Sequence, residues 1–166
     1  MNDSSATRAA RYAAQFEAAH DGFTALVASL TPEQWQLVGK NHPQRMNDED
    51  EGRTVGVIAH HVASSETLIM NRITSLLEGQ PPAQVDFKAS NAAHALRHAG
   101  VTPEEVLRKL NENKRTISEA VAAIPDDQLD LMRDTPIGPM SVAQRLERVL
   151  IGHVTTHQGS IEAAIA

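Results

Sequence analysis

The sequence predicts an all-α protein, an antiparallel four-helix bundle with long connections. Four long segments repeat apolar residues every three or four positions, which is the period of an amphipathic helix. Aromatic residues make up only 3% of the chain and alanine is plentiful, a composition that favours closely packed helices over aromatic-rich strands. No segment has a convincing strand period. Amphipathic helices of this length need one another to cover their apolar stripes, and 166 residues suit one domain over 1–166.

The first long helix is expected over about residues 6–30, where apolar side chains form one stripe. Residues 31–34 then combine a capping threonine, a first-turn proline and a capping-box glutamine, which predicts a short helical turn anchored by Trp35. A polar connection covers residues 36–52. The second long helix is expected from about residue 54 to 78, where a glycine and two prolines follow it.

A second long connection covers residues 80–101, and its middle, 90–99, could form a short helix. Connections this long inside a compact domain are often functional, and they leave the order of the helices around the bundle open. Thr102 opens the third long helix with another capping box, and Pro125 ends it. After a stretch rich in glycine and proline, Ser141 caps the fourth long helix, which continues to the end of the chain.

Composition limits the partners of the chain. The net charge is −6 and no run of basic residues occurs, so nucleic acid is not an expected partner. Without cysteine there is no disulfide, no thiolate ligand and no cysteine nucleophile. The N-terminus lacks the features of a secretory signal, and no eighteen apolar residues run together. We therefore expect a cytoplasmic protein with no membrane partner.

Two of the eight histidines, His153 and His157, lie on the apolar stripe of the last helix. Their i,i+4 spacing puts both imidazoles on one face, where two nitrogens could reach one metal ion. Buried imidazoles need partners for their ring nitrogens. A metal ion would supply one for both, and hydrogen bonds from polar neighbours such as threonine or glutamate are the alternative.

Four other histidines give weaker indications of a metal site. His94 and His98 have the same spacing but lie beside a loop, so we expect a solvated or rim-lining pair. His20 and His42 are expected to be structural or exposed.

His60 and His61 are adjacent and therefore point about 100° apart on a helix. His61 shares the apolar stripe, whereas His60 is angled towards its edge. Together with His153 and His157, His61 would complete a set of three nitrogen ligands with an open position, as in catalytic metal sites.

Two segments resemble motifs of the DinB-like (DinB/YfiT) superfamily. RTVGVIAHHVA, residues 53–63, resembles its second-helix motif, in which the metal-binding histidine precedes an aliphatic residue and so corresponds to His61. HVTTHQGSI, residues 153–161, resembles its last-helix motif, and Asn91 matches an asparagine that often follows the long connection. The chain departs from the pattern in carrying Arg53 where tryptophan is common. Its doubled histidine also leaves His60 as an alternative ligand.

The resemblance implies a bundle, often a homodimer, that holds a divalent ion on His61, His153 and His157. The superfamily includes transferases and isomerases that use the thiols mycothiol or bacillithiol. We therefore expect a thiol-dependent enzyme of this kind that acts on a small molecule. A metal-dependent hydrolase and a non-catalytic dimeric bundle with a structural metal are the alternatives.

Three neutral imidazoles leave a bound ion its full charge, so the open position would take water, a carboxylate or a thiolate. Nitrogen ligands suit Zn, Ni, Fe or Co. In a hydrolase, a carboxylate would relay a proton. Glu66, about one turn after His61, is the catalytic candidate, although its position favours a solvated side chain without that role. A deep polar opening formed by residues 36–52 and 80–101 would indicate catalysis, and a sealed site a structural metal.

Overall fold

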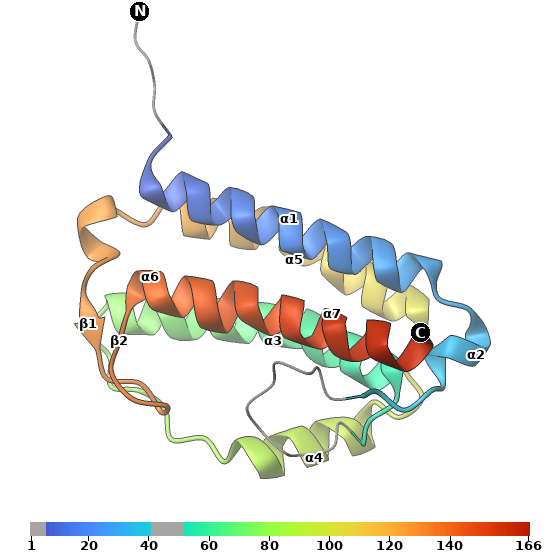
Figure 1. Ribbon diagram of the computed structural model, residues 1–166. Coiled ribbons are helices and arrows are strands. Elements are labelled where there is room, and N and C mark those ends of the chain that lie inside the picture. The colour runs from blue at the N-terminus through green and yellow to red at the C-terminus, as the bar shows by residue number, and fades with distance from the viewer. Residues whose placement is uncertain (1–5, 41–51) are drawn as a thin grey trace, which may run out of the picture.

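The computed structural model describes residues 6–40 and 52–166, and it confirms the predicted all-α bundle. Three of the long helices are continuous, and the fourth consists of three consecutive segments (Figure 1). The bundle is formed by α1 (Arg8–Ser29), α3 (Val55–Leu77), α5 (Pro103–Ala122) and the last helix, which comprises α6 (Val142–Arg145), the π-helical segment η2 (Leu146–Ile151) and α7 (Gly152–Ile165).

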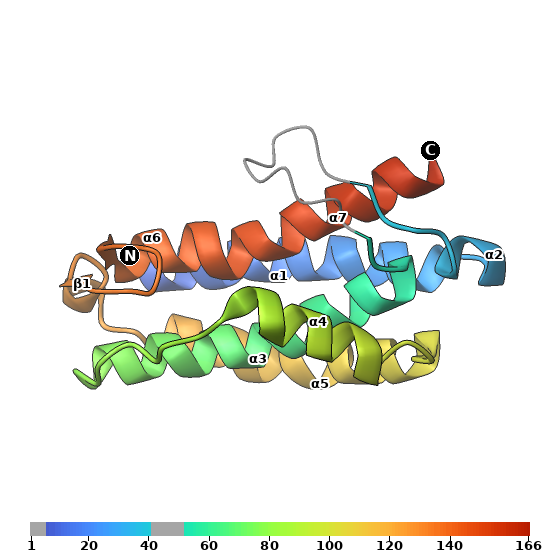
Figure 2. The same ribbon diagram turned by 90° about the horizontal axis from the view of Figure 1, so that it is seen from below.

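The helices run in two directions (Figures 1 and 2). α1 is antiparallel to α5, and α3 is antiparallel to the last helix, as expected for the bundle. α3 and α5, however, run the same way, because the long connection between them carries the chain back along the outside of the bundle. This connection contains α4 (Phe87–Arg97), the short helix predicted for residues 90–99, which begins three residues earlier because Asp86 caps it.

Polar side chains mark the helix starts at the predicted positions. The side chains of Thr54 and Thr102 accept hydrogen bonds from backbone N–H groups that have no partner inside the first helical turn. Thr31, Thr102 and Ser141 each form the complete capping box expected from the sequence. Local sequence therefore determines where these helices begin.

The short helix α2 (Pro32–Trp35) packs on the start of α3 through its last residue. Trp35 is buried, and its indole Nε1 donates a hydrogen bond to the carbonyl oxygen of Val101 at 3.0 Å. A Cβ atom at Gly56 would lie 2.5 Å from the indole ring, so only glycine permits this close contact.

Two apolar clusters fill the bundle, one towards each end. The first contains Phe16, Ile69, Met70, Ile73, Ile117, Val121, Leu146 and Leu150, among others. The second contains Phe23, Val27, Ile58, Val62, Val106, Leu110, Val154 and Ile161, among others. Along each helix the polar residues His20, Glu66, Asn113 and His153 fall between the two sets. A polar layer therefore crosses the middle of the bundle.

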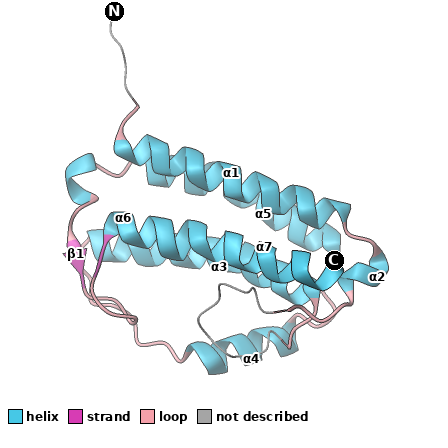
Figure 3. Ribbon diagram, viewed as in Figure 1, coloured by secondary structure: helices cyan, strands magenta, loops and turns pink. Residues whose placement is uncertain are grey.

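The stretch between α5 and α6 differs from the prediction, which contained no strand. A 3₁₀ turn, η1 (Asp126–Gln128), leads into a small antiparallel hairpin of β1 (Met132–Arg133) and β2 (Met140–Ser141) (Figure 3). Two residues per strand are too few to give a period-2 pattern. Within residues 6–40 and 52–166, no helix is long and apolar enough to cross a membrane.

Candidate metal centre and cavity

The structure brings together the three histidines that the sequence selected. His61 on α3 faces His153 and His157 on α7, although 92 residues separate His61 from His153. The Nε2 atoms of His61 and His153 lie 3.0 Å apart, and the ring centroids of His61 and His157 lie 5.0 Å apart. One nitrogen from each ring lies within 4.8 Å of the others. We call this group the first triad.

Local structure explains this convergence. His153 and His157 are one turn apart on α7 and so share a face. His157 is only 2% exposed, on a helix whose Val154 and Ile161 are fully buried in the second apolar cluster. His61 lies on the side of α3 that packs against α7.

Burial also sets the protonation state of His61. Desolvation lowers the pKa of His61 far below its ordinary value, and the neighbouring rings of His153 and His157 lower it further. His61 is therefore neutral at pH 7 and offers a lone pair instead of repelling a cation. Three close nitrogen donors in a buried site match the ligand type and number of zinc-like centres. The residues present fit a divalent transition-metal ion.

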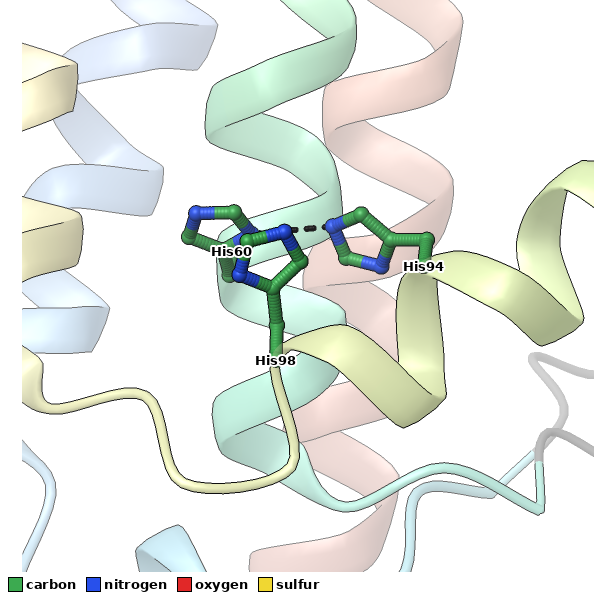
Figure 4. A group of neighbouring side chains, drawn as sticks. All are labelled: His60, His94 and His98. Carbon is green, nitrogen blue, oxygen red and sulfur yellow. Dashed lines mark hydrogen bonds between the residues drawn. The ribbon is translucent and has the colours of Figure 1, made fainter.

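A second group of three histidines lies next to the first. His60 on α3 meets His94 on α4 and His98, the residue that caps the C-terminal end of α4, with one nitrogen from each ring within 4.8 Å of the others (Figure 4). The Nδ1 atom of His60 lies 2.9 Å from Nε2 of His94, and the rings of His60 and His98 stack with centroids 3.8 Å apart. We call this group the second triad.

Of the two expected alternatives for His94 and His98, a solvated or a rim-lining pair, the second agrees with His94, which lines the cavity described below, but the sequence did not show that both rings are half-buried and converge on His60. Burial and the neighbouring imidazoles lower the pKa of His60 and of His94 to about 4. The doubled histidine and the second i,i+4 pair were the available signals. The missing information was that α4 packs with this face against α3.

A cavity of about 390 Å³ opens beside the first triad. Its walls come from α3, α4, the hairpin region and the last helix, and Asn91 is among the lining residues. Polar residues that line it include Ser64, Ser65, Arg72, Ser90, Asn91, His94, Arg97 and Arg145, and apolar ones include Leu68, Ile69, Val85, Phe87, Ile137 and Val149. None of the lining residues in the described part of the chain is Asp or Glu. The cavity is therefore positively charged or neutral along its walls.

Arg145 is unusual among the cavity residues because it is only 4% exposed. Its Nε and Nη1 atoms are buried and have no hydrogen-bond partner among the described residues. Burial and the nearby charge of Arg72 lower the pKa of the Arg145 guanidinium. A buried cation with free donors favours an anion beside it.

Glu66 lies elsewhere. It is 1% exposed, so the expected solvated side chain was wrong, and it is not among the residues that line the cavity. One carboxylate oxygen lies 2.8 Å from Nδ1 of His20, and the other accepts a hydrogen bond from Nδ2 of Asn113 at 2.9 Å. His20 was expected to be either structural or exposed, and its burial and its contact with Glu66 show that it is structural. His42 lies outside the described residues.

The second and last long helices of this bundle present three converging histidines, a group that could hold a metal ion. The chain belongs to the DinB superfamily, whose family model matches residues 9–161. This match confirms the resemblance seen in the two histidine motifs. The comparison with curated proteins gave no match.

Proposed function

We propose that this chain binds a divalent transition-metal ion through His61, His153 and His157 and acts as a thiol-dependent transferase or isomerase on a small molecule. The observation that carries the proposal is the cavity of about 390 Å³, which is lined by all three histidines of the first triad. A structural metal site is normally closed by four protein ligands, whereas a catalytic one keeps a position open. The cavity gives a ligand access to such a position.

A bound ion would hold a thiolate and lower the pKa of its parent thiol, so that the sulfur is a nucleophile at neutral pH. The chain has no cysteine, so the thiol would have to come from a small cofactor such as mycothiol or bacillithiol. The three histidines would bind and orient the ion. The exposed apolar side chains of Leu68, Phe87 and Ile137 would offer the apolar part of a substrate a surface to pack against.

The charge of the cavity indicates the class of ligand. Arg72, Arg97 and Arg145 line its walls, and two donor atoms of Arg145 are buried without a hydrogen-bond partner among the described residues. Guanidinium groups bind carboxylates and phosphates through paired hydrogen bonds. We therefore propose that the thiol cofactor or its co-substrate carries an anionic group that binds Arg145.

The hydrolase alternative has less support. Hydrolysis at a metal ion usually employs a carboxylate that moves a proton to or from water. No acidic residue of the described segments lines the cavity, and the Glu66 carboxylate is held in the core by His20 and Asn113.

Elemental analysis of purified protein tests the metal assignment. A double variant, His153→Gln with His157→Gln, should contain about one ion fewer per chain than the wild type. Thr155→Ala is the matched control, because Thr155 is exposed on α7 between the two ligands. Equal metal contents in the wild type and the double variant would overturn the assignment.

A thiol-conjugation assay tests the reaction class. We expect turnover of electrophilic small molecules only when mycothiol or bacillithiol is added, and none in the double variant. Metal-dependent hydrolysis without any thiol would instead support the hydrolase alternative.

A further inference from the structure

We propose that His60, His94 and His98 form a second metal site, so that the chain binds two transition-metal ions side by side. Of the three residues of the second triad, only His60 lies within the two motifs that contain the first triad. The proposal depends on the geometry of this group and not on the reaction assigned to the first triad.

The distances within the second triad suit a shared ion. Ligand nitrogens at about 2.0–2.1 Å from a tetrahedral ion lie about 3.3 Å from one another. The Nδ1 atom of His60 and the Nε2 atom of His94 already lie 2.9 Å apart, and a nitrogen of His98 lies within 4.8 Å of the other two. Rotation of the His98 side chain out of its stack on His60 would bring a nitrogen of each ring onto one ion.

The helices present these rings to one another. His94 and His98 are one turn apart on the face of α4 that lies against α3, and both rings stack on His60 from that side (Figure 4). The arrangement repeats that of the first triad, in which α7 supplies an i,i+4 pair and α3 supplies the third ring.

Hydrogen bonding alone satisfies the second triad less well than an ion would. Each neutral imidazole has one donor and one acceptor nitrogen. Among the described residues one hydrogen bond joins two of the three rings, between Nδ1 of His60 and Nε2 of His94, and the hydroxyl of Ser64 lies 3.4 Å from the same Nδ1 atom. An ion would engage a nitrogen of every ring, and three nitrogen donors favour Zn, Ni or Co over Mg or Ca.

The position of α4 indicates what a second ion would do. None of the residues of α4 is fully buried, so this helix has little apolar anchorage to the bundle. Nevertheless Phe87, Asn91 and His94 form part of the cavity wall. The rings of His94 and His61 are only 5.5 Å apart, so the second ion would lie next to the first. By joining α4 to α3 it would fix the wall of the cavity.

Metal stoichiometry tests the proposal. Protein stripped with a chelator is titrated with Zn(II), passed through a desalting column and analysed for zinc per chain, with circular dichroism as the check on folding. We expect two ions in the wild type and one in the double variant His94→Gln, His98→Gln. Lys88→Gln is the matched control, because Lys88 is exposed on the same helix, and it should retain two.

The first-triad variant makes the outcomes distinguishable. His153→Gln with His157→Gln should retain one ion if the second triad binds metal independently, and combining all four substitutions should leave none. Equal zinc contents in the wild type and in the His94→Gln, His98→Gln variant would overturn the second site. Loss of all zinc from each folded double variant would also overturn it, because it would mean that a single ion is shared by both triads.

Discussion

At the scale of single residues, the centre of the bundle contains a buried hydrogen-bonded network on the side of α3 away from the cavity. Glu66 joins His20 of α1 and Asn113 of α5, and Asn113 also donates to the carbonyl oxygen of Ala63 at 2.7 Å. The side chains of Glu66, His20 and Asn113 lie between the two apolar clusters. Buried polar groups are tolerated only when their hydrogen-bonding atoms have partners, and this network meets that condition.

Removing the carboxylate should reduce stability and leave metal binding unchanged. We expect Glu66→Ala to lower the free energy of unfolding by about 3 kcal/mol, because it leaves buried polar groups of His20 and Asn113 without their partner. Urea denaturation measures the loss. In a double-mutant cycle with His20→Ala, the losses of the two single variants should add up to more than the loss in the double variant. A fall in zinc content with unchanged stability would instead place Glu66 at the metal centre.

The residue scale also shows where sequence reasoning succeeded and where it failed. The first triad could be selected because its histidines lie on apolar stripes and in recognisable motifs. Glu66 was misplaced because its position one turn after His61 says nothing of the ring of His20, which comes from another helix. The convergence of His94 and His98 on His60 was missed for the same reason, since His60 is also on another helix.

At the scale of elements, contacts between short segments and long helices decide how the ends of the bundle are closed. Helix starts were predictable because the capping residues act within one turn. The hairpin and η2 were not, because neither has a periodic pattern of its own. The packing of α2 on α3 gave only one sequence signal, the apolar Trp35.

We expect Gly56→Ala to lower the free energy of unfolding by about 2 kcal/mol, because the new methyl group would overlap the indole of Trp35. Gly22→Ala is the control within a helix. Its Cβ would lie 3.7 Å from Oε1 of Gln158, an ordinary contact, so it should stabilise the protein by about 0.5–1 kcal/mol. Thermal melts of both variants test whether stability falls in Gly56→Ala and rises in Gly22→Ala. An unchanged stability of Gly56→Ala would contradict the close contact with Trp35.

The junction between η1 and α1 predicts an acid-sensitive contribution to stability. Asp126 accepts hydrogen bonds from the backbone N–H groups of Arg8 and Ala9, and these bonds lower the pKa of its carboxyl group below its ordinary value. A carboxyl whose pKa is lower in the folded chain stabilises it at neutral pH. That contribution disappears as the pH falls from about 4 through the folded pKa.

The stability difference between wild type and Asp126→Asn should therefore be largest near pH 7 and should shrink at about pH 3. Urea denaturation at both pH values measures it. Asp127→Asn, at the exposed neighbouring position, is the matched control. A difference independent of pH would show that the charge of Asp126 does not contribute.

At the scale of the whole molecule, the two histidine triads connect segments that are distant in the chain. The first triad joins α3 to α7, and the second triad joins α3 to α4. The bundle and the first triad could be predicted from stripes and motifs. The course of α4 along the outside, which creates the cavity wall and the second triad, depends on tertiary packing that no local pattern encodes.

Because the folded chain alone brings these nitrogens together, metal binding should stabilise the fold. Free Zn(II) at a hundredfold excess over its Kd should raise the free energy of unfolding by about 2.7 kcal/mol per site, less whatever the unfolded histidines bind. Melting curves with zinc and with EDTA measure the rise. The rise should fall in the His153→Gln, His157→Gln variant, and an unchanged rise would place the stabilising ion elsewhere.

The π-helical segment η2 immediately precedes the first-triad ligands of the last helix. Such a segment contains one residue more than the α-helical spacing requires, so it offsets the face of α7 from that of α6. Deleting a single residue between 146 and 151 would turn His153 and His157 by about 100° away from α3. The direction in which the two imidazoles point therefore depends on the number of residues in η2, and not only on the presence of histidine at positions 153 and 157.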